Sequence, residues 1–288
     1  MSLSYVNFPI YVGSANTSSI TYPAEQTTFL PSTTVSVGYG ASAAPNRTLG
    51  KSVAQDDQFK FGRPLNASIS FQMLLHDELP LNETGYSFLS GQSGDFFPVQ
   101  IGSGVFKKCY LQDYTVNIQP YIPVTVDVNF ISLDPPTEQK VSGDPAPYQN
   151  AFGTDPPFDG DKFVYGHTCS VENMTDVVGE VQSSISYRKN FNRTPTFTLG
   201  SINATDMLLD GIETETTITS TGLENLINFS GDETTNDLTI ALDNVEGNSI
   251  RFFTGIVVGA GARVLNESYN VVGGDTLQTS ATLREILL

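Results

Sequence analysis

The chain has 288 residues, with Lys+Arg 14 against Asp+Glu 31, which gives a formal net charge of −17. This charge argues against tight binding to nucleic acid or anionic lipid, because phosphate binding needs clustered Lys and Arg. The length fits one large domain or two smaller ones, and a chain with 39% hydrophobic residues can bury a core.

Motifs for catalysis and cofactor binding are missing from the sequence. The chain has two cysteines, Cys109 and Cys169, and two histidines, His76 and His167, and no nucleotide-binding, metalloprotease or hydrolase motif. We therefore expect free, buried thiols, structural histidines, no cofactor and no enzyme activity. The first residues lack a signal-peptide pattern, and the most apolar stretch, 255–265, is too short to cross a bilayer, so no membrane association is expected.

Strand patterns dominate the chain from its N-terminal part onward. Residues 65–73 alternate apolar and polar side chains, and residues 114–118 and 124–130 repeat this pattern. A period of two places one face on a core and the other in water, as in antiparallel sheets with one exposed face. Helical periodicity is rare, and one short helix near 86–89 is the most that we expect.

Residues 134–165 interrupt the strand pattern. They are rich in Asp, Pro and Gly, and Asp-Pro dipeptides favour turns while Pro cannot join the interior of a sheet. We therefore predict a linker here, between a first β domain at 1–133 and a second β domain at 166–288.

The two predicted domains resemble each other in sequence. An offset of 153 residues aligns 124–130 with 277–283, so that core positions meet core positions. The aligned core pairs are Val124 with Leu277, Val128 with Ala281 and Phe130 with Leu283. Farther upstream, an offset of 130 residues aligns Phe61-x-Arg63 with Phe191-x-Arg193. The difference between the offsets predicts an insertion around 206–236 in the second domain. The pattern favours a duplicated unit.

Acidic groups in the chain are candidates for two kinds of functional site, a calcium site and a catalytic acid/base pair. Asp155, Asp159 and Asp161 could offer oxygen ligands to calcium, although their spacing matches no EF-hand loop. Asp77-Glu78 or Glu213 with Glu215 could act as the acid and base of a glycosidase. In so acidic a chain such pairs arise by composition, and we expect no metal site and no catalytic pair.

Residues 46–50, residues 61–64 leading into 65–73, and the closing strands 124–130 and 277–283 are similar to those of phage tail tube proteins with two tandem tube domains. The resemblance implies two tandem antiparallel β-sandwich or barrel domains, each with at most a short flanking helix. It also implies that the inner sheets of neighbouring copies join around a pore.

The resemblance further implies partners and a location. Copies of the chain would form trimeric, pseudo-hexameric rings that stack into a tube, with a hexamer as the second choice. Other tail proteins, such as sheath, baseplate or terminator, would bind the tube. The chain would be assembled in the host cytoplasm and reside in the tail of the virion, and phage DNA would pass through without tight binding.

The same resemblance assigns roles to particular side chains. An acidic and hydroxyl-rich wall repels DNA at short range. The candidates for the lumen-facing wall are Asn66, Ser68, Ser70, Gln72, Thr125, Asp127, Asn129, Thr196, Thr198, Gln278, Ser280 and Thr282. Independently of the resemblance, the few cations of so acidic a chain suit either ion pairs between subunits or local ion pairs that aid solubility. The candidates for ion pairs between subunits are Arg47, Arg63, Arg188 and Arg193.

Other functions also fit the sequence pattern. A baseplate hub or tail terminator would use the same units to cap a tube. A capsid decoration protein, or a β-sandwich adhesin that binds carbohydrate, would also be acidic and rich in strands.

Overall fold

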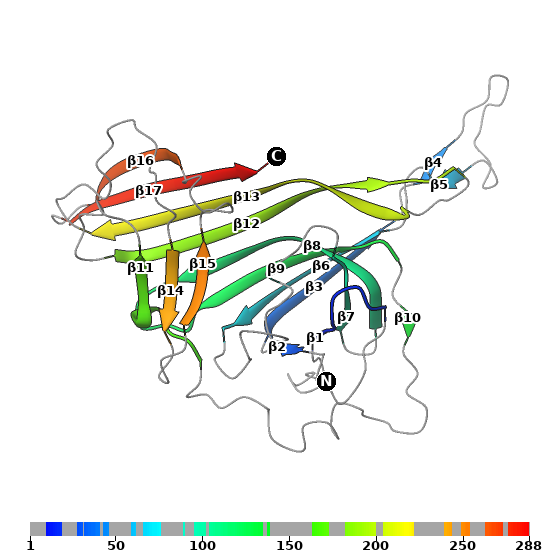
Figure 1. Ribbon diagram of the computed structural model, residues 1–288, viewed down its shortest axis with the longest axis horizontal. Helices are drawn as coiled ribbons and strands as arrows, with labels where there is room; N and C mark the ends of the chain where they lie inside the picture. Colours follow the sequence, from blue (N-terminus) through cyan, green and yellow to red (C-terminus); the bar gives the residue numbers. More distant parts are fainter. Residues whose placement is uncertain are drawn as a thin grey trace, which may run out of the picture.

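The computed structural model describes residues 10–18, 28–30, 32–40, 43–45, 59–61, 66–75, 89, 95–101, 104–134, 137–138, 163–172, 182–199, 204–221, 239–243, 249–253, 263–272 and 276–287. Most of these residues lie in strands, and neighbouring strands pair antiparallel (Figure 1). The predicted fold class, mainly β with antiparallel sheets, is confirmed.

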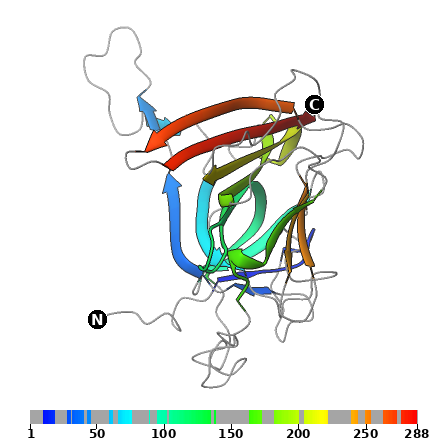
Figure 2. The same ribbon diagram turned by 90° about the vertical axis from the view of Figure 1, so that its left-hand side faces the viewer.

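The largest sheet runs without interruption from the first half of the chain into the second. Its first four strands, in spatial order, are β3 (Ser32–Gly40), β6 (Asn66–Leu74), β9 (Thr125–Ser132) and β8 (Gly104–Ile118). The next four strands are β12 (Gln182–Thr196), β13 (Asp206–Thr221), β17 (Thr276–Leu287) and β16 (Arg263–Val272). We call these two groups the first and the second unit of the main sheet. Figure 2 shows that the sheet is strongly curved.

Shorter strands lie beside the main sheet. The group β2 (Thr28–Leu30), β1 (Ile10–Val12) and β7 (Phe97–Ile101) joins the main sheet through β8, with which β10 (Thr137–Glu138) also pairs. A separate sheet contains β11 (Cys169–Glu172), β14 (Thr239–Asp243) and β15 (Ser249–Phe253), which run across the main strands in Figure 1. A hairpin of β4 (Ala43–Pro45) and β5 (Phe59–Phe61) and a 3-10 turn, η4 (Gly166–Thr168), complete the described elements.

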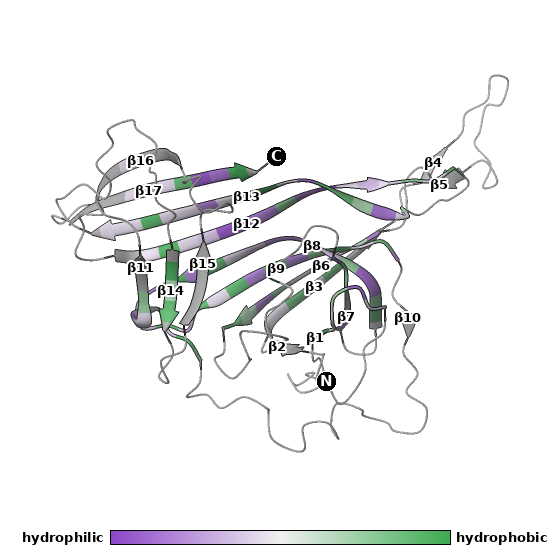
Figure 3. Ribbon diagram, in the orientation of Figure 1, coloured by the Kyte–Doolittle hydropathy of each residue, from purple (hydrophilic) through white to green (hydrophobic). Residues whose placement is uncertain are grey.

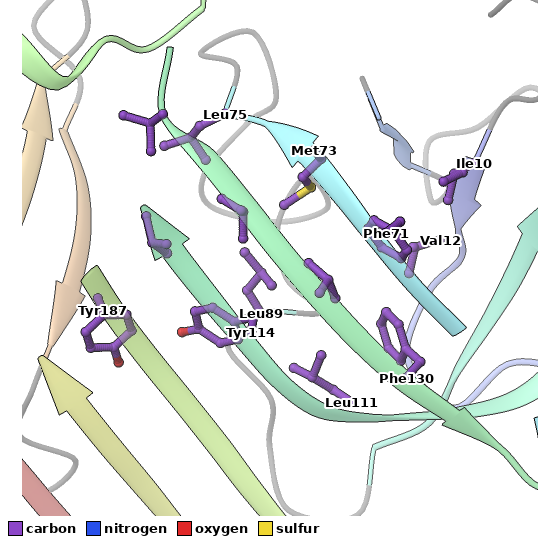
Figure 4. Packing of buried hydrophobic residues seen from close by; sticks show 14 of the residues in the cluster. Ile10, Val12, Phe71, Met73, Leu75, Leu89, Leu111, Tyr114, Phe130 and Tyr187 are labelled. Atoms are coloured by element: carbon purple, nitrogen blue, oxygen red, sulfur yellow. The ribbon is translucent and has the colours of Figure 1, made fainter. Parts of the chain in front are cut away.

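The hydrophobic core lies between the main sheet and these shorter strands. On β6 every second residue, from Ala67 to Met73, is buried, and β9 alternates in the same way. Figure 3 shows this alternation of hydrophilic and hydrophobic residues along the strands. The ring centroid of Phe130 lies 6.2 Å from that of Phe71 on β6 and 6.3 Å from that of Phe97 on β7, so Phe130 connects the main sheet to the shorter strands. Figure 4 shows Phe71 and Phe130 within this cluster. Ile240 of β14, in the separate three-stranded sheet, is buried in the same cluster.

The two units of the main sheet have the same topology. Across the sheet the order of strands is β3, β6, β9, β8 in the first unit and β12, β13, β17, β16 in the second. Numbered by their order along the chain, the strands of both units therefore follow the spatial order first, second, fourth, third. The pairing registers also agree: Val35 pairs with Phe71 on β3–β6, and Ile185 pairs with Ile218 at the corresponding place on β12–β13. Equivalent residues of the two units differ in residue number by 150 in the first strands (β3 and β12) and by 147 in the second strands (β6 and β13). In the third and fourth strands the difference is 153.

Register irregularities also recur at corresponding positions. The β8–β9 ladder skips one residue between Leu111 and Asp113, and the β16–β17 ladder skips one between Val264 and Asn266, at the offset of 153. The β3–β6 ladder is shifted between residues 32 and 34, and the β12–β13 ladder between residues 182 and 184. A bulge bends its strand and re-aims the side chains beyond it. The two units are therefore curved at equivalent points.

Two predictions about the second half need correction. The segment 206–221, part of the predicted insertion at 206–236, is β13, which pairs with both β12 and β17 and has β6 as its counterpart. The predicted upstream offset of 130 is replaced by 150 for the first strand and 147 for the second. The core face of β13 contains buried Thr214 and Thr216, so the hydrophobic alternation that marks β6 is weak there.

The predicted linker is attached to the sheets at both of its ends. β10 pairs with β8, and at the other end the N–H of Val164 donates to the carbonyl of Leu75 at 2.9 Å while Val124 donates to the carbonyl of Val164 at 2.8 Å. Residues 139–162 lie outside the described part. Of the predicted helix at 86–89, only Leu89 is described, and it is helical and buried. No helix in the described part is long and apolar enough to cross a membrane.

Candidate functional site

The main sheet has a polar face on the side opposite the core. Asn66, Ser68, Ser70 and Gln72 of β6 alternate with buried residues and lie on this face. Asp127 and Asn129 of β9 lie on it as well, because they pair in register with Gln72 and Ser70. Thr125 pairs with Leu74 and is the next residue of β9 on the same face. These seven predicted wall residues therefore share one surface. That this surface lines a lumen stays a prediction.

Hydrogen bonds connect polar side chains on this face across five strands. Thr33 Oγ1 donates to Gln72 Oε1 at 2.8 Å, and Gln72 Nε2 donates to Asp127 Oδ1 at 2.9 Å. Asn117 of β8 donates from Nδ2 to Asp127 Oδ2 at 2.9 Å, and Ser186 of β12 donates to Asn117 Oδ1 at 3.3 Å. Asp127 is the centre of this chain of bonds. We call this set the polar ladder.

The second unit continues the polar face. Thr217 of β13 and Thr282 of β17 lie opposite each other, with their hydroxyl oxygens 3.1 Å apart. Ser280 pairs in register with Thr219, and Gln278 with Thr221, so the predicted wall residues of β17 stand in register positions of the same face.

Two predicted wall residues lie elsewhere. Thr196 is the last residue of β12, in the part that extends beyond the pairing with β8, and its hydroxyl donates to the carbonyl of Asp206 at 3.2 Å. Thr198 follows the strand and is exposed. Both therefore belong to the projecting end of the β12–β13 pair, because the ladder with β8 ends at Asn190.

Charged groups on the polar face include more carboxylates than cations among the described side chains. Asp113, Asp127, Glu213 and Glu215 lie on it with Arg188 and Arg284. Arg188 Nη2 lies 3.6 Å from Asp113 Oδ2, and the side chain of Arg284 forms an ion pair with Glu213. The arginines are thus held by carboxylates of the same chain. Glu213 and Glu215 both lie on this charged face of the sheet.

The four predicted ion-pair arginines have different outcomes. Arg47 and Arg63 lie outside the described residues. Arg188 makes its ion pair inside the chain while 54% of its side chain is exposed. Arg193 donates from Nε to the carbonyl of Leu111 at 3.0 Å and stacks over Tyr110 and Phe191. Burial lowers the pKa of Arg193.

A projecting arm of the second unit packs onto the first. We define the arm as residues 191–199 and 204–211. Ala204 and Met207 of the arm are buried in one cluster with Tyr110 and Leu133. The hydroxyl of Tyr110 donates to Asp206 Oδ1 at 2.7 Å, and this bond, with that from the Met207 N–H, lowers the pKa of Asp206. Burial, followed by the bond to Asp206, raises the pKa of Tyr110 well above its usual range.

The junction of the two units has the geometry of an ordinary antiparallel ladder. β8 pairs with β12 from Asp113 opposite Asn190 to Ile118 opposite Ile185. It adds the Ser186–Asn117 hydrogen bond to the backbone pairing. A junction of this kind needs only a free edge on each partner.

Free edges of this kind occur at both ends of the main sheet. Within the described residues, β3 pairs only with β6, and β16 pairs only with β17. Val35 and Val37 of β3 stand in register with buried residues of β6, yet they are 38% and 42% exposed. Their counterparts beside β8, Ile185 and Tyr187, are 4% and 2% exposed. Equivalent positions are thus buried beside β8 and exposed at the outer edge.

The structure also describes the surroundings of both cysteines and of His167. Cys109 is buried, and burial raises the pKa of its thiol to about 12, whereas Cys169 is half-buried, and neither forms a disulfide. His167 is exposed, with its ring 6.1 Å from that of Tyr121 and 5.8 Å from that of Tyr165. His76 and the acidic groups at 77–78 and 155–161 lie outside the described residues. No group of metal-ligating side chains occurs within the described part of the chain.

Several residues of this surface were not predicted from sequence. Asp113 precedes the strand predicted at 114–118, which is longer in the structure as β8. Asn117 lies within the predicted strand but was not among the predicted wall residues. One sequence signal for the arm was available: Pro-x-x-Thr-Leu-Gly occurs at 45–50 and again at 195–200, at the offset of 150 that the first strands show.

No family model matches the chain, and no curated protein matches it.

Proposed function

We propose that the chain is the subunit of a phage tail tube, a structural conduit for DNA ejection with no chemistry of its own. Three copies would form a pseudo-hexameric ring, and rings would stack into the tube of the virion tail after assembly in the host cytoplasm. Sheath, baseplate or terminator proteins would be its partners. The observation that carries this proposal is the repeated register of the two units.

The repeat supports assembly because the β8–β12 ladder already joins one unit to the next within the chain. β8 is the third strand of the first unit along the chain, and β12 is the first strand of the second. The outer edges offer the same two strands again: β16 is a third strand and β3 is a first strand. A second copy placed at β16 would therefore repeat the β8–β12 junction, and the eight strands alternate in direction so that this joint is antiparallel.

The offsets fix the register of the proposed joint between copies. Asn190 lies opposite Asp113 inside the chain, which places Gly40 of one copy opposite Asn266 of the next. By the same rule Ser36 lies opposite Asn270, as Ser186 lies opposite Asn117. The joint would also cover Val35 and Val37, whose counterparts are buried. A symmetric end-to-end assembly of this kind closes into a ring if its rotation allows.

The polar face supports the conduit role. Joining the sheets of several copies gives one continuous surface, and its cations at Arg188 and Arg284 are already paired with Asp113 and Glu213. DNA that moves along a wall must break every phosphate contact that it makes, so free Lys and Arg would slow it. A wall of hydroxyls, amides and carboxylates makes few such contacts. The net charge of −17 fits this role.

Electron microscopy of the purified protein, combined with native mass measurement, tests the proposal. We expect closed rings or stacked tubes of uniform diameter whose mass is a multiple of three chains. A strictly monomeric protein that never polymerises, also in the presence of tail partners, would contradict it. Copy number per virion separates a repeated tube subunit from a hub or terminator.

A further inference from the structure

One apolar side chain at the end of the main sheet is exposed where its counterpart is buried. Ile286, near the end of β17, is 52% exposed. The offset of 153 makes it the counterpart of Leu133, which follows β9 and is 3% exposed. The registers and bulge positions beside both residues are the same, so the difference comes from what covers them.

The arm of the second unit covers Leu133. Ala204 and Met207 are buried against Leu133 and Tyr110, and the arm is fixed there by the bonds from Tyr110 to Asp206 and from Arg193 to the Leu111 carbonyl. Residues on the other side of the arm remain open: Leu208 is 57% exposed. The arm therefore reaches back over the preceding unit of the sheet and buries the end of its fourth strand.

The β4–β5 hairpin is the counterpart of the arm in the first unit. Pro45 pairs with Phe59 in the hairpin, and Pro195 pairs with Met207 in the arm. Lys60 likewise stands at the register position of Leu208. Both segments connect the first and second strands of their unit, and the Pro-x-x-Thr-Leu-Gly sequence follows each first strand.

The hairpin cannot serve the end of β17 in its own chain. It connects β3 and β6 at one edge of the main sheet, and β9, β8, β12 and β13 separate that edge from β17. It forms a two-stranded sheet of its own and projects from the main sheet in Figure 1. Within the described part of the chain, Ile286 at the end of β17 is thus left exposed, and the hairpin pairs with no strand of the main sheet.

We propose that the β4–β5 hairpin of one copy docks over Ile286 of the neighbouring copy, as the arm docks over Leu133 inside the chain. This inference rests on the proposed ring, in which β3 of one copy follows β16 of another. Each joint between copies then has two parts, a strand ladder and a clasp. A heterologous contact of this kind is used once per subunit around the ring.

Mixing two single-cysteine variants tests the clasp. Ile286→Cys protein and Phe59→Cys protein, both carrying Cys169→Ser, are mixed, assembled and oxidised, and chains are separated without reductant. Phe59 stands at the position of the buried Met207, so we expect a shift from monomer to disulfide-linked dimer. Lys60→Cys, at the position of the exposed Leu208, is the matched control and should remain monomeric with the same partner.

A labelling measurement gives an answer that does not depend on disulfide geometry. In assembled rings, the thiol of Ile286→Cys should react with maleimide more slowly than in the dissociated chain. Replacing residues 43–61 by a Gly-Ser linker should restore fast labelling while the strand ladder still holds the ring together.

The outcomes separate this inference from the proposed function. Rings in which Phe59→Cys links no better than Lys60→Cys, and in which Ile286→Cys labels as fast as in the dissociated chain, overturn the clasp and leave the tube. A chain that forms no ring overturns both.

Discussion

The joint inside the chain and the two outer edges place equivalent residues in different surroundings. At the inner joint, Ile185 and Tyr187 of β12 are buried beside β8, while Val35 and Val37 at the same register positions of β3 are exposed. The registers and bulges agree, so strand geometry does not explain the contrast. Ile185 and Tyr187 are buried in a cluster with residues of both β8 and β14, so the contrast comes from what surrounds the strands. The proposed joint between copies would place a neighbouring strand beside Val35 and Val37.

The cores of the two units also differ, and the difference concerns stability. The core face of β6 has Ala67, Ile69, Phe71 and Met73, whereas β13 has buried Thr214, Thr216 and Ser220 around Ile218. Burying a hydroxyl gains less than burying an aliphatic group of similar size. We therefore expect the first unit to contribute more to the free energy of unfolding.

The largest expected effect compares two corresponding core residues. Phe130→Ala removes a ring that contacts Phe71 and Phe97, and should lower the free energy of unfolding by about 3–5 kcal/mol. Leu283 is its counterpart, and Leu283→Ala should cost about 2–5 kcal/mol and less than the first change. Urea unfolding of the two variants measures the difference. A larger loss for Leu283→Ala would contradict the ranking of the two units.

The strands that could be predicted from the sequence are those whose core positions are apolar. Alternation at 65–73 and 124–130 predicted β6 and β9 because apolar side chains occupy every core position. β13 was missed because Thr214 and Thr216 occupy core positions, which removes the period-two signal of hydrophobicity. The offset of 153 was predicted because Val128 and Phe130 align with the apolar residues Ala281 and Leu283.

The candidate surface was predicted in part, for a related reason. Seven wall residues on β6 and β9 could be predicted because their strands are unambiguous. The partners of Asp127 across strands, such as Asn117, depend on register, which alternation alone does not fix. The packing of the arm against Tyr110 brings together residues 96 positions apart, and alternation within a strand does not predict such a long-range contact.

A smaller effect is expected for the polar ladder. Asp127→Ala removes the acceptor of both Gln72 and Asn117 and should cost about 1–3 kcal/mol of unfolding free energy. Ser280 is the counterpart in the second unit, and Ser280→Ala should stay within about 0.5 kcal/mol. Thermal or urea unfolding of both variants provides the measurement. Equal costs would show that the ladder does not stabilise the first unit.

The arm gives a pH-dependent prediction. Tyr110→Phe removes the hydrogen bond to Asp206 and should cost about 1 kcal/mol near neutral pH. Because that bond holds the pKa of Asp206 below its usual value, its contribution is present above about pH 4 and is lost as the pH falls through the folded pKa. The difference between Tyr110→Phe and the unchanged protein should therefore shrink in acid. Tyr121→Phe, at an exposed ring, is the control and should show no such dependence.

The smallest effect concerns thiol reactivity in the two halves. Burial raises the pKa of Cys109 to about 12, so almost no thiolate forms near neutral pH, and the side chain is shielded. Cys169 is half-buried and should react first with a thiol reagent. Mass spectrometry of the partly labelled protein identifies the modified residue. Equal labelling of Cys109 in the folded chain would contradict its placement in the core.

The central claim is that β16 of one copy continues into β3 of the next with the register of the inner joint. Its direct test mixes Ser36→Cys protein with Asn270→Cys protein, both with Cys169→Ser, and measures disulfide-linked dimers after assembly. We predict strong linkage for this pair, because the counterparts Ser186 and Asn117 are hydrogen-bonded, and weak linkage when Ser268→Cys replaces Asn270→Cys. Assembled rings with no linkage at Ser36, or with equal linkage to both partners, would contradict the account.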